Sequence, residues 1–273
     1  SAGTAVAVIN YISQIFTPVE SLGMEIQTIQ SAVAGVRRIN EFLSQSEPAS
    51  RKPVSLPANL PAGQPQVELR NVAFGYDDHT VLQSICLQIQ AGEQVTLAGR
   101  TGAGKSTVFK LLLGLYAPQS GSVLIEGVPA ADIADQDRRA LFGYVEQRFH
   151  QVPGAVLDQI TLYDPAISDQ AVRTAAKLAG LSDTIDSLPQ GYDTPCTPEL
   201  FSQGQWQLLS IARAAAADPR ILLLDEITAN LDAETENTVL QALRRVSADR
   251  TVISISHRTG AQTGRVIPIE PAH

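Results

Sequence analysis

The sequence has few of the residues that mark disulfide-rich, metal-rich or nucleic-acid-binding proteins. Its 273 residues include two cysteines and four histidines, without the spacing of a metal site or the number that a disulfide framework needs. A reducing, cytosolic compartment is the simplest interpretation. Aspartate and glutamate outnumber lysine and arginine, 28 to 20, so the formal net charge is −8. Nucleic-acid-binding proteins normally present a basic surface, so nucleic acid is not expected as the main partner.

The sequence contains no strong candidate for a membrane-spanning helix. A membrane-spanning helix needs about 20 apolar residues. Residues 1–19 carry no charged side chain, but Asn10, Ser13 and Gln14 make this segment a weak candidate. Pro18 is expected to kink or interrupt a helix there. The chain starts with Ser and lacks a basic stretch near its start, which argues against a secretory signal peptide.

Residues 22–43 are predicted to form an amphipathic helix. Apolar residues recur at helical spacing, and polar residues occupy the other face. The apolar stripe consists of Leu22, Ile26, Ile29, Val33, Val36 and Leu43. Two interpretations remain open from the residues alone. The helix adjoins the cytoplasmic side of a membrane, which Arg37 and Arg38 suit, or it covers a soluble domain.

Residues 46–65 are predicted to be a linker, because five prolines between residues 46 and 66 favour an extended, semi-rigid chain. After the linker, two strand candidates at 67–74 and 81–89 are followed by apolar runs that alternate with helical patterns. These runs are 95–98, 122–125, 143–145, 221–224 and 252–255. The alternation predicts an α/β domain over residues 66–273 with a largely parallel sheet flanked by helices. Residues 148–217 are predicted to be mostly helical.

The most informative motif is Gly99-Arg-Thr-Gly-Ala-Gly-Lys-Ser-Thr107, which reads G-x-x-x-x-G-K-[ST]. It lies between a strand candidate and a helical pattern, as a phosphate-binding loop requires. The glycines let backbone N–H groups face phosphate oxygens. Lys105 can reach the β- and γ-phosphates of ATP, and Ser106 can bind Mg²⁺. The nucleotide contacts are expected at Gly99, Arg100, Thr101, Gly102, Ala103, Gly104, Lys105, Ser106 and Thr107. A flexible turn before a helix is the alternative, but it leaves the Lys-Ser pair unexplained.

A second motif is an apolar strand that ends in two acids, Arg220-Ile-Leu-Leu-Leu-Asp-Glu226. Such a strand should be central in the sheet, with its carboxyl end at the edge where ligands bind. Asp225 is then placed to hold Mg²⁺ through its water shell, and Glu226 to polarise an attacking water. The alternative is an acid pair that merely ends a strand.

Four further motifs lie after the phosphate-binding loop, in this order along the chain: Gln147, Phe201-Ser-Gln-Gly-Gln205, Ala229-Asn-Leu-Asp232 and His257. Together with the loop and the acid pair, residues 66–260 resemble the nucleotide-binding domain of an ATP-binding-cassette (ABC) transporter. The resemblance implies a P-loop NTPase core with a mostly parallel sheet. It also implies an antiparallel β subdomain and a helical subdomain, preceded here by a helical N-terminal segment.

The resemblance also implies roles within one subunit. Tyr76, in Phe74-Gly-Tyr76, would stack on adenine. Gln147 would contact Mg²⁺ and the attacking water, and His257 would contact the γ-phosphate. Gln147 and His257 would thus be catalytic together with Glu226 and Lys105.

Other implied roles belong to a head-to-tail dimer of identical or different cassettes. Ser202, Gly204 and Gln205 would contact ATP held by the opposing subunit, and Asp232 would lie at the interface. The usual Leu-Ser-Gly-Gly-Gln pattern is altered here, because Gln203 replaces a glycine. Its side chain would narrow the approach to phosphate if that position requires a positive φ.

Residues 1–45 resemble the end of the last membrane-spanning helix of exporter-type ABC proteins. The matching residues include Tyr11, Phe16-Thr-Pro18 and Arg38-Ile-Asn-Glu-Phe-Leu43. The resemblance implies an ATPase that powers export, joined to its own membrane domain, with the cassette on the cytoplasmic side of the cell membrane. The alternatives are a soluble ABC ATPase of DNA repair or translation, and a regulatory nucleotide-binding module without turnover. The transported substrate stays open.

Overall fold

The computed structural model describes residues 2–44, 54–57, 60–61, 63–77, 79–227, 231–256 and 264–271. The chain forms two compact units, Ser1–Arg51 and Lys52–His273. Their boundary falls within the segment predicted to be a linker. Part of that segment joins the second unit, because the Val54 amide donates to Asp132 O at 2.8 Å and Leu56 packs against the core.

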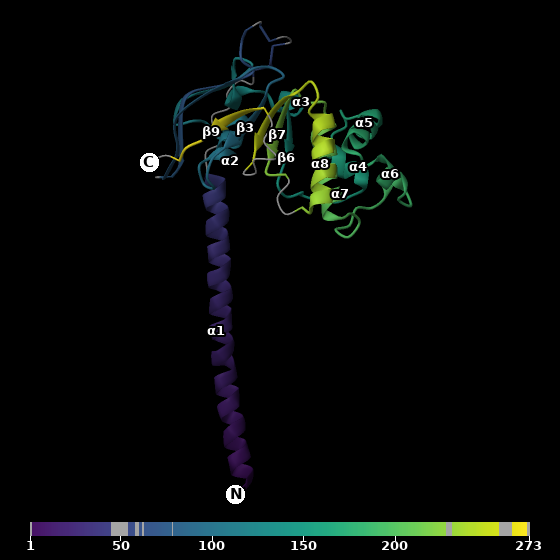
Figure 1. The fold of residues 1–273 in the computed structure, drawn as a ribbon. Helices are drawn as coiled ribbons and strands as arrows, with labels where there is room; N and C mark the ends of the chain where they lie inside the picture. Colours follow the sequence, from purple (N-terminus) through teal and green to yellow (C-terminus); the bar gives the residue numbers. More distant parts are fainter. Residues whose placement is uncertain are drawn as a thin grey trace. The chain divides into compact units, whose positions relative to one another are not determined.

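The described part of the first unit is one helix, α1 (Ala2–Ser44), of 43 residues (Figure 1). At 1.5 Å per residue it is about 65 Å long. Of the two expected effects of Pro18, a kink or an interruption, the interruption does not occur, because the helix runs through this position. Proline removes one backbone hydrogen bond, and long helical stretches on both sides keep their own. None of the described helices combines the length and apolar character needed to cross a membrane.

The second unit contains a parallel sheet in the order β6-β7-β8-β3-β9. Its strands are β6 (Phe142–Val145), β7 (Ile221–Asp225), β8 (Thr251–Ile255), β3 (Gln94–Ala98) and β9 (Arg265–Pro268). Side chains of the interior strand β7 alternate between two hydrophobic clusters, one on each face of the sheet. Burial on both faces explains its continuous apolar run. β9 was not predicted, because it is a short, partly exposed edge strand that includes a proline.

An antiparallel sheet in the order β2-β1-β4-β5 covers the other side of one cluster. Its strands are β1 (Val67–Tyr76), β2 (His79–Ile89), β4 (Ser120–Ile125) and β5 (Val128–Pro129). The run at 122–125 was expected to belong to the parallel sheet, and this is wrong. Its residues pair antiparallel with β1, with Val123 opposite Leu69 and Ile125 opposite Val67. A short apolar run does not specify which sheet it joins.

The remaining helices pack against the sheets or against one another. They are α2 (Lys105–Leu112), α3 (Asp135–Leu141), α4 (Val156–Thr161), α5 (Asp169–Ala179), α6 (Ser182–Asp186), α7 (Gln203–Ala215) and α8 (Ala233–Val246). Short 3-10 turns lie at Ala130–Asp132 and Gly191–Asp193. Helices α4 to α7 occupy the region predicted to be mostly helical and gather beside α8 (Figure 1). The predicted P-loop α/β fold, with its antiparallel and helical parts, is confirmed.

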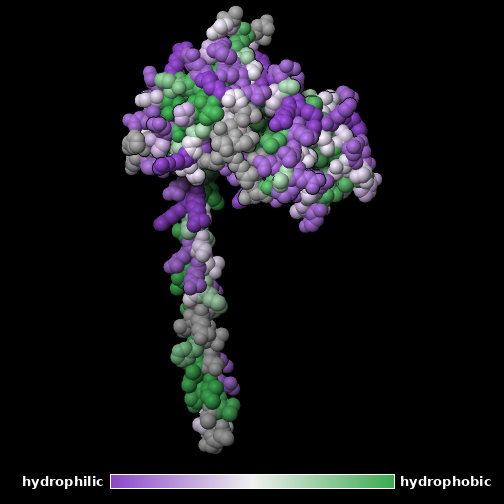
Figure 2. Space-filling view, viewed as in Figure 1, coloured by the Kyte–Doolittle hydropathy of each residue, from purple (hydrophilic) through white to green (hydrophobic). Residues whose placement is uncertain are grey.

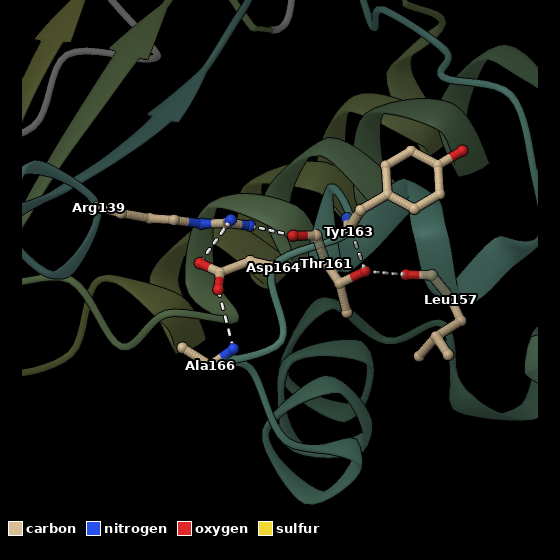
Figure 3. A network of polar contacts seen from close by, with 6 residues as sticks. All are labelled: Arg139, Leu157, Thr161, Tyr163, Asp164 and Ala166. Carbon is tan, nitrogen blue, oxygen red and sulfur yellow. Dashed lines mark hydrogen bonds and ion pairs between the residues drawn. The ribbon is translucent and has the colours of Figure 1, made fainter. Parts of the chain in front are cut away.

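A polar network ties α3 to the end of α4 (Figure 3). Arg139 donates to Asp164 Oδ2 at 2.7 Å and to the carbonyl oxygen of Thr161. The turn between them has two consecutive left-handed residues, Leu162 and Tyr163. The guanidinium therefore holds a turn of unusual backbone geometry against the core.

Candidate nucleotide-binding site

The loop between β3 and α2 requires glycine at two positions. Gly104 has φ 91°, and a Cβ atom there would lie 2.5 Å from Leu82 Cδ2. A Cβ atom at Gly99 would lie 2.4 Å from Ile269 O. Residues of β2 and of the segment after β9 thus hold the loop in place. The backbone N–H groups of the first turn of α2 are consequently set at the end of β3, where a helix N terminus favours an anion.

The side chain of Lys105 folds back over this loop. Its Nζ donates to Gly99 O and Arg100 O, each at 3.0 Å, and the residue is 5% exposed. Burial lowers the pKa of Lys105, while the charges of Glu226 and Asp225 act in the opposite direction. The ammonium therefore lies near both predicted acids. Charge-assisted hydrogen bonds to phosphate could replace its two carbonyl contacts.

Asp225, at the end of β7, accepts a hydrogen bond from the hydroxyl of Tyr144 on the neighbouring strand β6, at 3.1 Å. Burial raises the pKa of Asp225, the Tyr144 hydrogen bond opposes this, and the charge of Glu226 adds to it. Burial and the Asp225 charge also raise the pKa of Tyr144 far above its usual range. Tyr144 could not be assigned to this site from the sequence, because only the pairing of β6 with β7 brings the two residues together.

Glu226 follows directly and adopts a left-handed backbone conformation, with φ 47°. Its amide donates to Ile255 O, at the end of β8, at 3.1 Å. A left-handed conformation costs a residue with a side chain about 1–2 kcal/mol. Backbone strain of this kind is often found at functional sites. His257, which was predicted to contact the γ-phosphate, follows two residues after Ile255 and lies outside the described residues.

The residues present fit a magnesium ion. Asp225 is a half-buried carboxylate whose pKa is raised by burial and by neighbouring negative charge. A divalent cation would offset the electrostatic cost of keeping this carboxylate ionised. Mg²⁺ is typically held by one or two carboxylates together with water and substrate phosphates. Among the described residues, no group of three or more His, Cys, Asp or Glu side chains could hold a metal ion.

The segment predicted to reach the opposing ATP begins α7. Ser202 caps this helix: its hydroxyl accepts from the Gln205 amide at 3.3 Å, and Gln205 Oε1 accepts from the Ser202 amide at 2.9 Å. The Ser202 side chain is exposed. Gln203 lies in the first turn with a negative φ, so the steric cost considered for a left-handed position does not arise there.

Gly204 connects this helix to the cap of α8. A Cβ atom at Gly204 would lie 2.3 Å from Thr235 Cγ2. Asp232 caps α8 by accepting from the Glu234 and Thr235 amides, and its Oδ2 accepts from Thr235 Oγ1 at 2.7 Å. These hydrogen bonds lower the pKa of Asp232. Thr235 is held by two contacts, so it cannot easily move away from Gly204.

We expect Gly204→Ala to destabilise the second unit by about 1–3 kcal/mol, because the methyl group must displace Thr235 or its bond to Asp232. At about 2–4 °C per kcal/mol, thermal unfolding should shift down measurably. Gly35→Ala makes the same chemical change where no atom lies within 4 Å, and it should leave the transition of the second unit unchanged. Equal melting temperatures for Gly204→Ala and the parent would contradict the packing.

Tyr76 lies in an aromatic cluster at the end of β1. Its ring makes edge contacts with Phe74 at 5.0 Å and with Tyr116 at 5.5 Å between centroids. Lys110 Nζ donates to the Tyr76 hydroxyl at 3.3 Å. Tyr116 is 43% exposed and was not predicted here. The cluster offers an aromatic surface of the kind on which a base can stack.

The structure brings together part of the predicted set. Lys105, Asp225 and Glu226 interact electrostatically, and the cap of α8 packs against Gly204. In the loop, Arg100, Thr101 and Ser106 are exposed. Thr107 and Ala103 are buried. Gln147, which lies in the loop after β6, is also exposed.

Comparison with known proteins supports the same interpretation. The family described as "ABC transporter" matches residues 82–229. The uncharacterized ABC transporter ATP-binding protein YfiC of Bacillus subtilis is 37% identical over 261 residues, covering 94% of this chain and 43% of that protein. The alpha-hemolysin translocation ATP-binding protein HlyB of Escherichia coli O157:H7 is 36% identical and covers 99% of this chain and 38% of its own length.

Two further relatives bear the name of one exporter type. The ATM1-type heavy metal exporter of Novosphingobium aromaticivorans is 36% identical, covering 94% of this chain and 43% of its own length. A solved structure of a bacterial Atm1-family ABC exporter with ATP bound matches with TM-score 0.72 and 32% identity. It covers 99% of this chain and 48% of that chain. The chain thus spans less than half the length of these relatives.

Proposed function

Because the chain belongs to the ABC transporter family, we propose that it binds and hydrolyses ATP to power export of a substrate across a membrane. The observation that carries the proposal is the buried Lys105 at the start of α2, within electrostatic reach of Asp225 and Glu226. The relatives reported above are transporters, so nothing in them favours the DNA-repair alternative.

Several groups of the chain contribute to phosphate binding and to hydrolysis in this proposal. Backbone N–H groups of the loop and of the first turn of α2 bind the phosphates, and Lys105 turns from its carbonyl contacts to phosphate oxygens. Glu226 accepts a hydrogen bond from water and takes its proton as the water oxygen attacks the γ-phosphorus. The bond to the bridging oxygen breaks, and ADP leaves with phosphate. When bound by Ser106, Asp225 and Gln147, Mg²⁺ would neutralise negative charge on the phosphates.

Two cassettes are proposed to face each other head to tail, so that each loop meets the α7 N terminus of the other. Ser202 is exposed at that terminus, and the helix dipole there favours a phosphate. Asp232 is likewise exposed beside it. ATP would then stabilise the dimer by mass action, and hydrolysis would release it.

Helix α1 is proposed to be the end of a membrane-domain helix. Its large apolar side chains are solvent-exposed, such as Ile9 at 62%, Phe16 at 61% and Ile29 at 61%. Apolar residues are concentrated toward its N-terminal end (Figure 2). Exposed apolar surface of this extent is typical of an interaction site. The membrane domain of the same transporter is the partner we propose, with the ATPase unit on the cytoplasmic side of the cell membrane.

Release of inorganic phosphate from MgATP by the purified chain tests the proposed activity. Turnover that rises more steeply than protein concentration would support a dimeric ATPase. The rival hypothesis, a regulatory nucleotide-binding module, predicts nucleotide binding without phosphate release.

Deletion of residues 1–45 should leave ADP affinity within about twofold of the parent, since every predicted contact lies in the second unit. It should also raise solubility, because the exposed apolar side chains of α1 are removed. ADP titration and sedimentation of both proteins provide the test. A truncated chain that unfolds would show that α1 is part of the folded core, and the membrane-helix proposal would have to be dropped.

A further inference from the structure

Gln207, in the second turn of α7, connects the two loops that follow β6 and β7. Its side-chain amide donates from Nε2 to Gln147 O at 3.0 Å and to Ile227 O at 3.4 Å. Gln147 was predicted from the sequence to contact the attacking water, and Ile227 directly follows Glu226. One amide group thus holds the backbone at both predicted catalytic positions.

The Gln207 side chain makes these contacts in the protein interior. Gln207 is 6% exposed, and its Oε1 is buried without a hydrogen-bond partner among the described residues. Buried polar atoms in folded proteins are nearly always paired, and exceptions call for an explanation. An apolar side chain of the same length would avoid the unpaired oxygen. What the glutamine supplies is therefore its two donated hydrogen bonds.

A short stretch of regular helix separates Ser202 from Gln207. Ser202 is the N-cap of α7, fixed by its capping box, and Gln207 lies in the second turn. A shift at the exposed end consequently moves the amide. Beside it, a cavity of about 450 Å³ is lined by Gln147, Gln203 and Gln207 among others, so the packing leaves room for such a shift.

We infer that Gln207 is a positioning residue, which transmits the position of the α7 N terminus to the backbone at Gln147 and Glu226. Contact of a second cassette with Ser202 would set the helix, and the amide would then align both loops for hydrolysis. This inference rests on the proposed function, because it assumes turnover at a site completed by the partner.

Gln207→Met conserves length and removes both donors, so it is the variant of choice. We expect kcat to fall about tenfold or more, with ADP affinity and KM within about twofold of the parent, since the nucleotide contacts themselves are untouched. The melting temperature should fall by only a few degrees, because the two carbonyl oxygens lose their donor while the unpaired glutamine oxygen is removed as well. Gln241→Met, on the exposed face of α8, is the matched control and should behave like the parent.

A double variant separates positioning from simple structural support. If Gln207 acts through Ser202, then Gln207→Met should lower kcat much less in a Ser202→Ala background than alone. Additive losses, an unchanged kcat, or a loss of ADP affinity and melting temperature that parallels kcat would each overturn the inference. A parent that binds ADP but releases no phosphate contradicts the proposed function as well. A parent with normal turnover beside an unaffected Gln207→Met contradicts the inference alone.

Discussion

Replacing Glu226 by glutamine should lower phosphate release by about a hundredfold or more, the usual contribution of a general base, while MgATP binding persists. The carboxamide has the same size as the carboxylate, but it cannot take a proton from water. The backbone hydrogen bond to Ile255 O, which sets the strained residue at the end of the sheet, does not involve the side chain and should survive. Single-turnover phosphate release measures the loss of chemistry directly.

The same variant should accumulate as an ATP-bound dimer, because binding continues when hydrolysis stops. Sedimentation with and without MgATP reports this state, and Glu25→Gln on the exposed surface of α1 provides the matched charge change. If Glu226→Gln keeps the turnover of the parent, another group activates the water, and the proposed role of Glu226 is wrong. A variant that stays monomeric at high ATP and protein concentration would contradict the head-to-tail dimer for this chain.

Lys105→Ala should weaken ATP binding by about tenfold or more, since each hydrogen bond from a charged group contributes about 1.5–3 kcal/mol. The ammonium is nearly buried and already donates to two carbonyl oxygens of the loop. Without it, the phosphates lose one compensating cation next to the negative charges of Asp225 and Glu226. Calorimetric titration with ATP in a Glu226→Gln background measures affinity without turnover.

Lys177→Ala, on the exposed face of α5, removes the same charge far along the sequence and should leave ATP affinity unchanged. Equal affinity for Lys105→Ala and the parent would mean that the loop between β3 and α2 does not hold the phosphates. The glycine geometry of the loop would then need another explanation.

Local motifs could be predicted from the sequence because the spacing of their residues follows from local backbone geometry and burial. The loop at residues 99–107 needs glycines where the backbone is crowded, and Gly99 and Gly104 are crowded by Ile269 and Leu82. The apolar run of the strand at 221–225 indicates burial because both of its faces are covered. In both cases a few neighbouring residues carry the physical cause.

Contacts between distant segments could not be predicted in the same way. Tyr144 meets Asp225 only because β6 pairs with β7, and Thr235 meets Gly204 only because α7 packs on α8. The run at 122–125 could have joined either sheet, since its own residues do not choose a neighbour. The Gln207 contacts likewise depend on three segments that the fold brings together.

The most direct test of a site shared between two cassettes is a mixing experiment with Lys105→Ala and Ser202→Arg. In a head-to-tail dimer each variant alone has a defect in both sites. A mixed dimer has one site with both defects and one site with none, because the symmetric interface exchanges the halves. Phosphate release should therefore be low for each variant and should recover when the two are mixed. A mixture that stays as inactive as its components, or a Ser202→Arg protein that turns over at the parent rate, would contradict the shared site.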